Sequence, residues 1–166
     1  MLIDMDFNNG ENISLTEVPT LTSNYSPSGG IAFSRNSGET TWKAFDNDDT
    51  TYVVCKEYNH SAENYIGYNF NIPICIKTVT MKPMLNHTAK AVTVKIQAFD
   101  NEVTQDWVDL YSQSSWTATN NVTSTFSLTN TKKYNTYRIW FSDGLATYSS
   151  GTYTYIKSLQ FSTTTQ

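Results

Sequence analysis

The segment Asp46–Thr51 reads DNDDTT and places three carboxylates and two hydroxyls within six residues. Oxygen groups at this spacing can supply several ligands to one Ca²⁺, which takes six to eight oxygens at roughly 2.3 to 2.6 Å. Glu57 stands at the twelfth place of an EF-hand count from Asp46. The EF-hand interpretation fails, because the sixth place is Thr51 instead of glycine and no helical pattern flanks the loop. The segment is therefore a calcium loop of another kind or an Asx-rich turn.

Side chains suited to catalysis are sparse in this sequence. A glycosidase needs two carboxyls roughly 5 to 9.5 Å apart across the scissile bond, and the Asp46 cluster is better explained by its turn and a metal. The G-x-S-x-G, H-E-x-x-H, P-loop and G-x-G-x-x-G patterns are absent. Cys55 and His60 could form a dyad only on a bent loop, because strand residues five apart point to opposite faces. We therefore predict no catalytic residues and no enzyme activity.

Composition indicates which elements must position these groups. The chain has 166 residues, 16% charged and 14% aromatic, with Thr, Ser, Asn and Tyr in the polar positions, which is typical of one β-rich domain. The net charge of −4, with scattered cations, argues against a nucleic-acid partner. No apolar run approaches the ~20 residues that span a bilayer, so we expect no membrane insertion. The start, MLIDMDFNNG, lacks signal-peptide features, and if Met1 is native we expect no export by the usual secretory route.

The two cysteines lie in apolar runs, VVC at Cys55 and IPICI at Cys75. Such runs are typical of strands, where a free cysteine behaves as a small buried hydrophobe. We favour that interpretation over a disulfide or a reactive thiol, and zinc has no support.

Residues alternate between apolar and polar in several strand-length runs, separated by clusters of Asn, Gly, Ser, Asp and Pro. In Val92–Phe99, for example, Val94 and Ile96 fall on one face and Lys95 on the other, as one packed and one wet face require. The pattern predicts strands at Tyr65–Phe70, Ile74–Lys82, Val92–Phe99, Trp107–Ser112, Thr123–Leu128, Tyr137–Phe141 and Tyr155–Phe161.

Six short motifs, in this order and spacing, resemble the discoidin or coagulation factor 5/8 type C family, which includes many carbohydrate-binding modules. They are PTLTSNYSPSG (Pro19–Gly29), TWKAFDNDDTTY (Thr41–Tyr52), NYIGYNF (Asn64–Phe70), DWVDLYS (Asp106–Ser112), YRIWFSDG (Tyr137–Gly144) and YIKSLQF (Tyr155–Phe161). The resemblance implies an all-β jelly-roll sandwich of about eight main antiparallel strands, with a helical turn at 43–47. We divide the chain into residues 1–16, an attachment segment or extra strand, the sandwich at 17–162, and a frayed tail at 163–166.

The resemblance also gives the Asp46 loop a specific role. Many modules of this kind hold a structural Ca²⁺ there, which would use the carboxylate of Asp46, oxygens around Asp48 and the hydroxyl or carbonyl of Thr51. A glutamate from the last strand closes the family's site, and here that position is Ser158. Ser158 removes a charged ligand, so a plain Asx-rich turn is favoured over one structural Ca²⁺. That ion is the only cofactor the sequence suggests, and its role would be to brace the loop.

Seven aromatic residues match apolar positions of the family, and we expect them in the core: Trp42, Phe45, Tyr65, Tyr68, Phe70, Trp107 and Phe161. Sugar binding requires exposed aromatic rings and planar polar side chains, which such modules carry on loops at one end of the sandwich. The matching loops are 34–39, 56–63, 85–90 and 145–153. Their candidate glycan-binding residues are Arg35, Asn36, Glu57, Tyr58, His60, Asn86, His87 and Tyr148.

Together these features predict a non-catalytic, lectin-like module that binds carbohydrate weakly and is displayed in several copies or as a homo-oligomer. The segments TLTSNYSPSG and WKAFDNDDTTY resemble those of bacteriophage tail, fibre and virion-surface proteins, and also those of surface enzymes of Gram-positive and gut bacteria. We therefore expect an adhesin on a virion surface, attached to other virion or surface proteins through its N-terminal segment. The alternatives are a structural virion protein that uses the sandwich for protein contacts, and an accessory module of a larger bacterial glycoside hydrolase.

Overall fold

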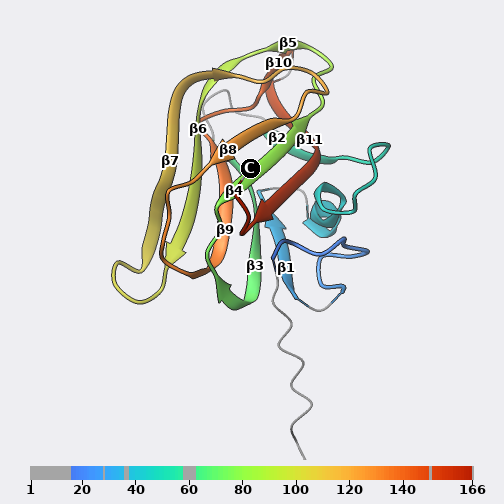
Figure 1. Ribbon diagram of the computed structural model, residues 1–166. Helices are drawn as coiled ribbons and strands as arrows, with labels where there is room; N and C mark the ends of the chain where they lie inside the picture. Colours follow the sequence, from blue (N-terminus) through green and yellow to red (C-terminus); the bar gives the residue numbers. More distant parts are fainter. Residues whose placement is uncertain (1–15, 28, 36–37, 58–62, 150, 166) are drawn as a thin grey trace, which may run out of the picture.

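Two antiparallel sheets pack face to face to form the expected jelly-roll sandwich (Figure 1). The computed structural model describes residues 16–27, 29–35, 38–57, 63–149 and 151–165, without the side chains of residues 39, 56 and 57. Eleven strands and one 3₁₀ helix lie in this part of the chain. The proposed segment 1–16 therefore lies almost wholly outside the described residues.

The first sheet has five strands in the order β1-β3-β9-β6-β7. Their bounds are β1 Gly30–Ser34, β3 Asn64–Ile74, β9 Tyr134–Phe141, β6 Ala91–Asp100 and β7 Asp106–Thr117. The second sheet has the order β5-β10-β11-β4-β8, and β2 also pairs with β11. Their bounds are β5 Thr88–Ala89, β10 Ala146–Tyr148, β11 Gly151–Ser162, β4 Thr78–Pro83, β8 Ser124–Ser127 and β2 Val53–Glu57.

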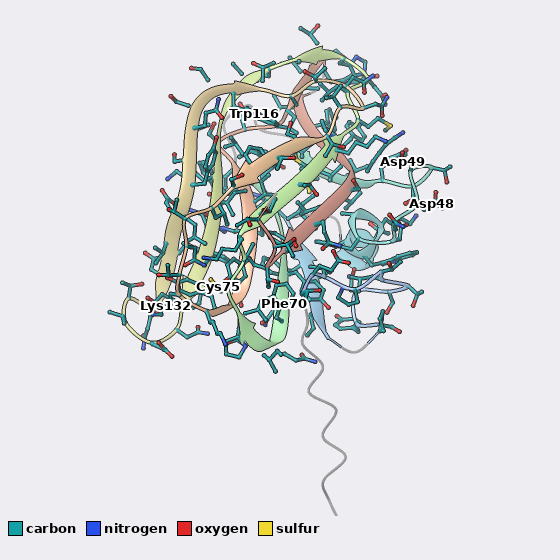
Figure 2. All side chains as sticks on the ribbon, in the orientation of Figure 1. Asp48, Asp49, Phe70, Cys75, Trp116 and Lys132 are labelled. Atoms are coloured by element: carbon teal, nitrogen blue, oxygen red, sulfur yellow. The ribbon has the colours of Figure 1, made fainter. Side chains whose placement is uncertain are left out.

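The core lies between the inner faces of the two sheets and follows the alternation of the sequence. On β9, Tyr137, Ile139 and Phe141 are buried and the residues between them face outward. On β11, Ile156 and Phe161 are buried on the inner side of the other sheet. Phe70 extends into the same interior (Figure 2). Burial of these apolar side chains, at roughly 25 cal/mol per Å², is the main favourable contribution to folding.

The chain crosses from one sheet to the other at residues 75–77. The pattern predicts one strand at Ile74–Lys82, whereas the structure ends β3 at Ile74 and begins β4 at Thr78. The buried hydroxyl of Tyr137 donates to the carbonyl of Ile74 at 2.6 Å and accepts from the amide of Ile76 at 3.4 Å. A core tyrosine thus satisfies backbone groups that the sheets leave unpaired, and burial raises its pKa to about 12.

The helical turn comes earlier than the resemblance implies. The 3₁₀ helix η1 spans Gly38–Ala44 instead of 43–47. The buried side chain of Asn24 donates to the carbonyl of Gly38 at 3.0 Å and accepts from the amide of Trp42 at 2.7 Å, so it fixes both ends of this turn. Phe45 follows η1 into the core, and Trp42 packs against the core while half-buried.

We predict that Tyr137→Phe lowers the free energy of unfolding by about 1 to 3 kcal/mol, because the carbonyl of Ile74 loses its buried donor. Urea unfolding at neutral pH measures the change. Tyr111→Phe is the matched control, since the Tyr111 hydroxyl donates to Gln113 on the exposed surface, and we expect an effect within about 0.5 kcal/mol. Equal losses in both variants would contradict the assignment.

Candidate functional site

The four loops expected to bind glycan leave the sandwich at the same end. Register places Ser34 opposite Ile66, and both Asn64 and Val94 opposite Phe141. The ends of β1 and β9 and the starts of β3 and β6 are therefore neighbours. Strands β5 and β10 lie at this end, at the top of Figure 1. Of the expected residues, Asn36, Tyr58, His60 and the side chain of Glu57 lie outside the described residues.

His87 and Tyr148 are brought together at this end. Strand β10 pairs with β5 through Thr147 and Thr88, which sets the preceding His87 beside Tyr148. Their ring centroids are 4.2 Å apart with an interplanar angle of 70°. Tyr148 is 43% exposed, and His87 and its neighbour Asn86 are exposed as well. An exposed aromatic pair beside a side-chain amide has the chemical character of a carbohydrate site.

Asp143 anchors the loop that carries Tyr148, and it was not predicted. Its carboxylate accepts from the amide of Gly144 at 2.6 Å and from the hydroxyl of Thr152, and it forms an ion pair with Lys90. Burial alone would raise the pKa of Asp143, but the hydrogen bonds from Lys90, Thr152 and Gly144 hold the pKa below its usual value. The sequence signal at this position is the Asp143-Gly144 pair, which is typical of a turn and does not by itself indicate an anchoring role.

Gly144 is required by a close approach to the next strand. A Cβ atom at Gly144 would lie 2.5 Å from the amide nitrogen of Tyr153 and 2.7 Å from the carbonyl carbon of Thr152. Both are backbone atoms, which cannot move aside as a flexible side chain does. The backbone at Leu85, before the loop of His87, is also held in place, because its amide donates to Asn120 Oδ1 at 2.9 Å. The candidate site therefore stands on a rigid frame.

Arg35 lies in a different network, on the five-stranded sheet. Its Nη1 donates to the carbonyl of Glu63 at 2.8 Å and lies 3.8 Å from Glu63 Oε1. Glu63 Oε2 in turn accepts from the indole of Trp140 at 2.6 Å. These contacts direct Arg35 toward the start of β3, whereas His87 and Tyr148 lie on β5 and β10 of the other sheet.

The outer face of the five-stranded sheet carries aromatic rings covered by cations. The guanidinium of Arg138 lies 3.9 Å from the ring centroid of Trp107 and 4.9 Å from that of Tyr65. Lys95 Nζ lies 5.4 Å from the ring centroid of Trp140. The expectation that Tyr65 and Trp107 belong to the core is therefore wrong, because both are half-buried on the outward face. Phe45, Tyr68, Phe70 and Phe161 are in the core as expected.

The Asp46 loop gathers several oxygens around the hydroxyl of Thr51. This hydroxyl lies 2.6 Å from Asp46 Oδ2, 3.2 Å from the carbonyl oxygen of Asp48 and 3.4 Å from the carbonyl oxygen of Lys43. Oxygens that share one Ca²⁺ at roughly 2.3 to 2.6 Å must approach one another in this way. The carboxylate of Asp48 instead accepts from the amide and hydroxyl of Thr50, which lowers its pKa. Figure 2 shows Asp48 and Asp49 projecting outward.

These four oxygens fit a calcium site that needs further ligands. In the described part of the chain, no three His, Cys, Asp or Glu side chains form a metal cluster, so such a site would depend on carbonyl and hydroxyl oxygens. An adjoining hollow of about 310 Å³ is lined by Asn47 and Ser158, the position where the family carries glutamate. Glu17 lines the same hollow and brings a carboxylate to it.

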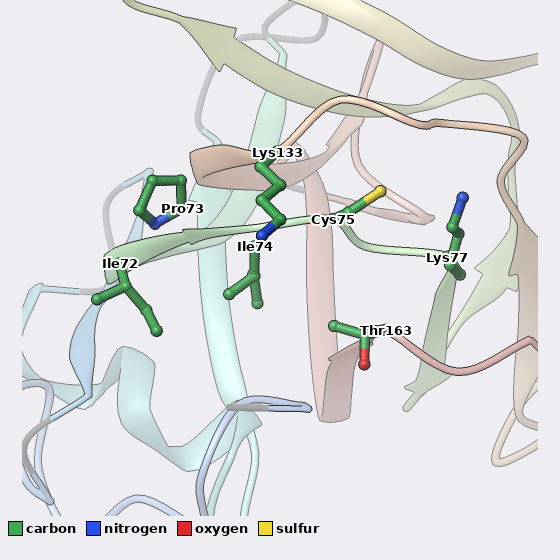
Figure 3. A pocket seen from close by; sticks show the side chains of 7 residues that line it. All are labelled: Ile72, Pro73, Ile74, Cys75, Lys77, Lys133 and Thr163. Atoms are coloured by element: carbon green, nitrogen blue, oxygen red, sulfur yellow. The ribbon is translucent and has the colours of Figure 1, made fainter. Parts of the chain in front are cut away.

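Another hollow, of about 390 Å³, lies at the end of the sandwich where β3 ends and β9 begins, and Figure 3 shows the side chains that line it. It is lined by Ile72, Pro73, Ile74, Cys75, Lys77, Lys133 and Thr163. Both cysteines are free thiols, but the expectation of a buried strand position is wrong for Cys75, which is half-buried in the segment between β3 and β4. Cys55 is buried, and burial raises its pKa to about 12, so it remains an unreactive thiol at neutral pH. Among the described residues, no helix is long and apolar enough to cross a bilayer.

Comparison with solved structures places the fold among carbohydrate-binding modules. The family 32 module of C. perfringens NanJ, solved with galactose, matches with a TM-score of 0.60 and 15% identity, over 88% of this chain and 97% of that chain. The family 32 module of AlyQ, solved with 4,5-unsaturated mannuronic acid, matches with a TM-score of 0.60 and 16% identity, over 81% and 95%. Chitosan-binding module 1 of the Paenibacillus sp. IK-5 chitosanase/glucanase matches with 0.58 and 15%, over 80% and 94%. No family model and no curated protein matches the sequence.

We predict that Asp143→Asn lowers the free energy of unfolding at neutral pH by about 1 to 3 kcal/mol, because it removes the charge that Lys90, Thr152 and Gly144 stabilise. A carboxylate whose folded-state pKa is depressed stabilises the fold above its unfolded pKa of about 4, and this contribution is lost as the pH falls through the folded pKa. The variant should therefore lose less stability than the parent between neutral pH and about pH 3.

Urea unfolding at several pH values measures both effects. Asp49→Asn is the control, because Asp49 also pairs with a lysine, Lys82, but its side chain is 62% exposed. We expect a change below about 1 kcal/mol for this surface pair. Asp143→Asn with the stability and acid sensitivity of the parent would contradict the role of Asp143.

Proposed function

We propose that this protein is a non-catalytic carbohydrate-binding module whose primary site is the His87–Tyr148 pair. The observation that carries the proposal is this exposed aromatic pair, 4.2 Å apart, held on the Asp143 frame at the loop end of the sandwich. The neighbours with this fold are binding modules that carry no catalysis of their own, although some belong to larger enzymes. The likeness of fold supports carbohydrate binding as the function, and the His87–Tyr148 pair supports the location of the site.

The pair suits a sugar for chemical reasons. The ring of Tyr148 offers an apolar face to the C–H groups of a pyranose, and its hydroxyl can both donate and accept. The imidazole of His87 and the amide of Asn86 add polar groups at the same edge. A site of this size on an open surface matches few hydroxyls, so we expect affinities between micromolar and millimolar, with display in several copies providing avidity.

Removal of either ring tests this site. We predict that His87→Ala and Tyr148→Ala each weaken binding at least tenfold, because each loses a contact of the pair. The measurement is binding of a multivalent fusion to a glycan array that includes galactose, uronic acid and amino-sugar glycans. Tyr25→Ala is the control, since Tyr25 is 67% exposed on a loop outside the site. An array with no bound glycan, or binding unchanged in both variants, would refute the proposal.

We further propose that the Asp46 loop holds one structural Ca²⁺, using Asp46, the carbonyl of Asp48 and Thr51. The convergence of three oxygens, from Lys43, Asp46 and Asp48, on the Thr51 hydroxyl supports this set. Glu17 is a candidate for the charge that Ser158 cannot supply, because both line the adjoining hollow. The ion would neutralise the carboxylates and hold the loop, without any part in catalysis.

Calcium should raise the melting temperature, because an ion that binds only the folded state stabilises it. We predict a saturable increase with Ca²⁺ that a chelator reverses and that Mg²⁺ does not reproduce. Thr51→Val should abolish the shift, whereas Thr50→Val should retain it, since the Thr50 hydroxyl serves only the Asp48 carboxylate. Differential scanning calorimetry is the measurement. A melting temperature insensitive to both Ca²⁺ and chelator would show that the loop is a plain turn.

The setting we propose is a virion surface, where copies of the module would bind host or environmental glycans. The support is the similarity of residues 19–52 to segments of phage tail, fibre and virion-surface proteins. Residues 1–16 are proposed to attach the module to other virion or surface proteins, and a homo-oligomer would supply avidity. The alternative is a purely structural virion protein. Binding on the glycan array would exclude this alternative, and an array with no bound glycan would support it.

An accessory module of a larger glycoside hydrolase is the second alternative, and specific observations favour it. One neighbour is a module from a family 31 glycoside hydrolase of Clostridium perfringens, and another match covers 31% of a longer AlyQ chain that also has an alginate lyase domain. Immunogold labelling of purified virions, compared with the size of the native protein in its source, distinguishes the two settings.

A further inference from the structure

Four tyrosines and one histidine form a continuous strip on the outer face of the six-stranded sheet. The tyrosine strip consists of Tyr148, Tyr153, Tyr155 and Tyr52, with His87 at one end. Successive ring centroids, starting from His87, are 4.2, 5.7, 6.0 and 5.9 Å apart. Each ring is therefore in contact with the next one along the row. The strip therefore extends the His87–Tyr148 pair well beyond the loop end.

Strand register explains why these rings share one face. On β11, Thr152, Thr154 and Ile156 are buried in the core, so Tyr153 and Tyr155 point to the outside. Tyr153 pairs with Ala146 on β10, which places it diagonally beside Tyr148. Tyr155 pairs with Val54 on β2, and Tyr52 lies two residues earlier on the same side.

The strip is more exposed than stabilisation of the sheet requires. Tyr148 and Tyr52, at its two ends, are 43% and 41% exposed, and the two rings between them are half-buried. A row of large aromatic rings open to water on one surface is typical of a ligand surface. Its far end meets a hollow of about 380 Å³, lined by Thr40, Lys43, Thr50, Thr51, Tyr52 and Val54.

The chemistry of the strip selects a neutral, hydroxyl-rich ligand. Burial raises the pKa of Tyr155, as do the neighbouring hydroxyls of Tyr153, Tyr52 and Tyr148. A tyrosine hydroxyl can donate as well as accept a hydrogen bond. A row of several contacting rings, with hydroxyls along it, is longer than one terminal sugar and suits consecutive residues of an oligosaccharide better.

We propose that the tyrosine strip continues the His87–Tyr148 site and binds an extended, uncharged oligosaccharide along the sheet, from His87 to Tyr52. This inference rests on the proposed carbohydrate function and adds the ligand's length. A short sugar meets only His87 and Tyr148, whereas a longer chain also reaches Tyr153, Tyr155 and Tyr52. Affinity therefore increases with chain length until the strip is filled.

Isothermal titration with galactose and with neutral galacto-, cello- and chitin-oligosaccharides of one to six units tests the proposal. Tyr52→Ala should weaken binding of the longest chains about three- to tenfold and leave the shortest sugars unchanged, since one ring contact is lost only when the ligand reaches it. His87→Ala should weaken both. Tyr155→Phe keeps the ring, so it should retain most of the affinity. Thermal melting verifies that each variant folds.

Incorporation of 3-fluorotyrosine gives a direct readout of the rings reached by each ligand. A short sugar should shift the fluorine resonance of Tyr148, and a long chain should also shift those of Tyr155 and Tyr52. Glycan binding that is independent of length and unchanged by Tyr52→Ala would overturn the strip while leaving the proposed function intact. Binding of none of these neutral sugars would overturn the strip, and the proposed function would fall with it only if the glycan array also showed no binding. Self-association that Tyr52→Ala abolishes, without any length dependence, would make the strip a protein interface and also overturn the proposal.

Discussion

The carboxylate of Asp143 connects three segments that the candidate site needs. It accepts from Gly144 at the turn after β9, from Thr152 on β11, and it pairs with Lys90 before β6. A charge removed from water destabilises a fold unless it is paired and hydrogen-bonded, and here three partners compensate. Because β5 and β10 are too short to be stable alone, the position of His87 beside Tyr148 depends on this anchor.

The two sheets use their outer aromatic residues differently. On the five-stranded sheet, Arg138 lies over Trp107 and Lys95 lies near the ring of Trp140, so cations of the protein already occupy the ring faces. Such cation–π contacts stabilise the exposed side of a sheet by about 0.5 to 2 kcal/mol each. On the six-stranded sheet, the tyrosine rings contact one another and His87. On the five-stranded sheet, cations of the protein thus already contact the aromatic rings. On the six-stranded sheet, the rings of the tyrosine strip are the ones that we propose for a ligand.

Alternation with a period of two predicted the long strands, because β3, β6, β9 and β11 each bury one face. The same parity could have corrected one error, since Tyr65 is odd-numbered while the buried Ile66 and Tyr68 are even-numbered on the same strand. A motif shared with a family shows that an aromatic residue is needed, but not on which face it lies. Strands of two or three residues carry no period, so β5 and β10, and with them the His87–Tyr148 contact, came only from long-range pairing.

The Asp46 loop and the tyrosine strip adjoin at the peptide bond between Thr51 and Tyr52. Thr51 belongs to the Asp46 oxygen set, and the next residue, Tyr52, packs against Tyr155 at 5.9 Å. Since a peptide unit is planar and leaves two soft torsions per residue, the way the loop holds Thr51 largely fixes where the ring of Tyr52 lies. An ion that orders the loop would therefore reduce the entropy lost when Tyr52 is immobilised against a glycan. Linkage requires the reciprocal effect, so a chain long enough to reach Tyr52 would strengthen ion binding by the same factor, whereas a sugar confined to His87 and Tyr148 would not.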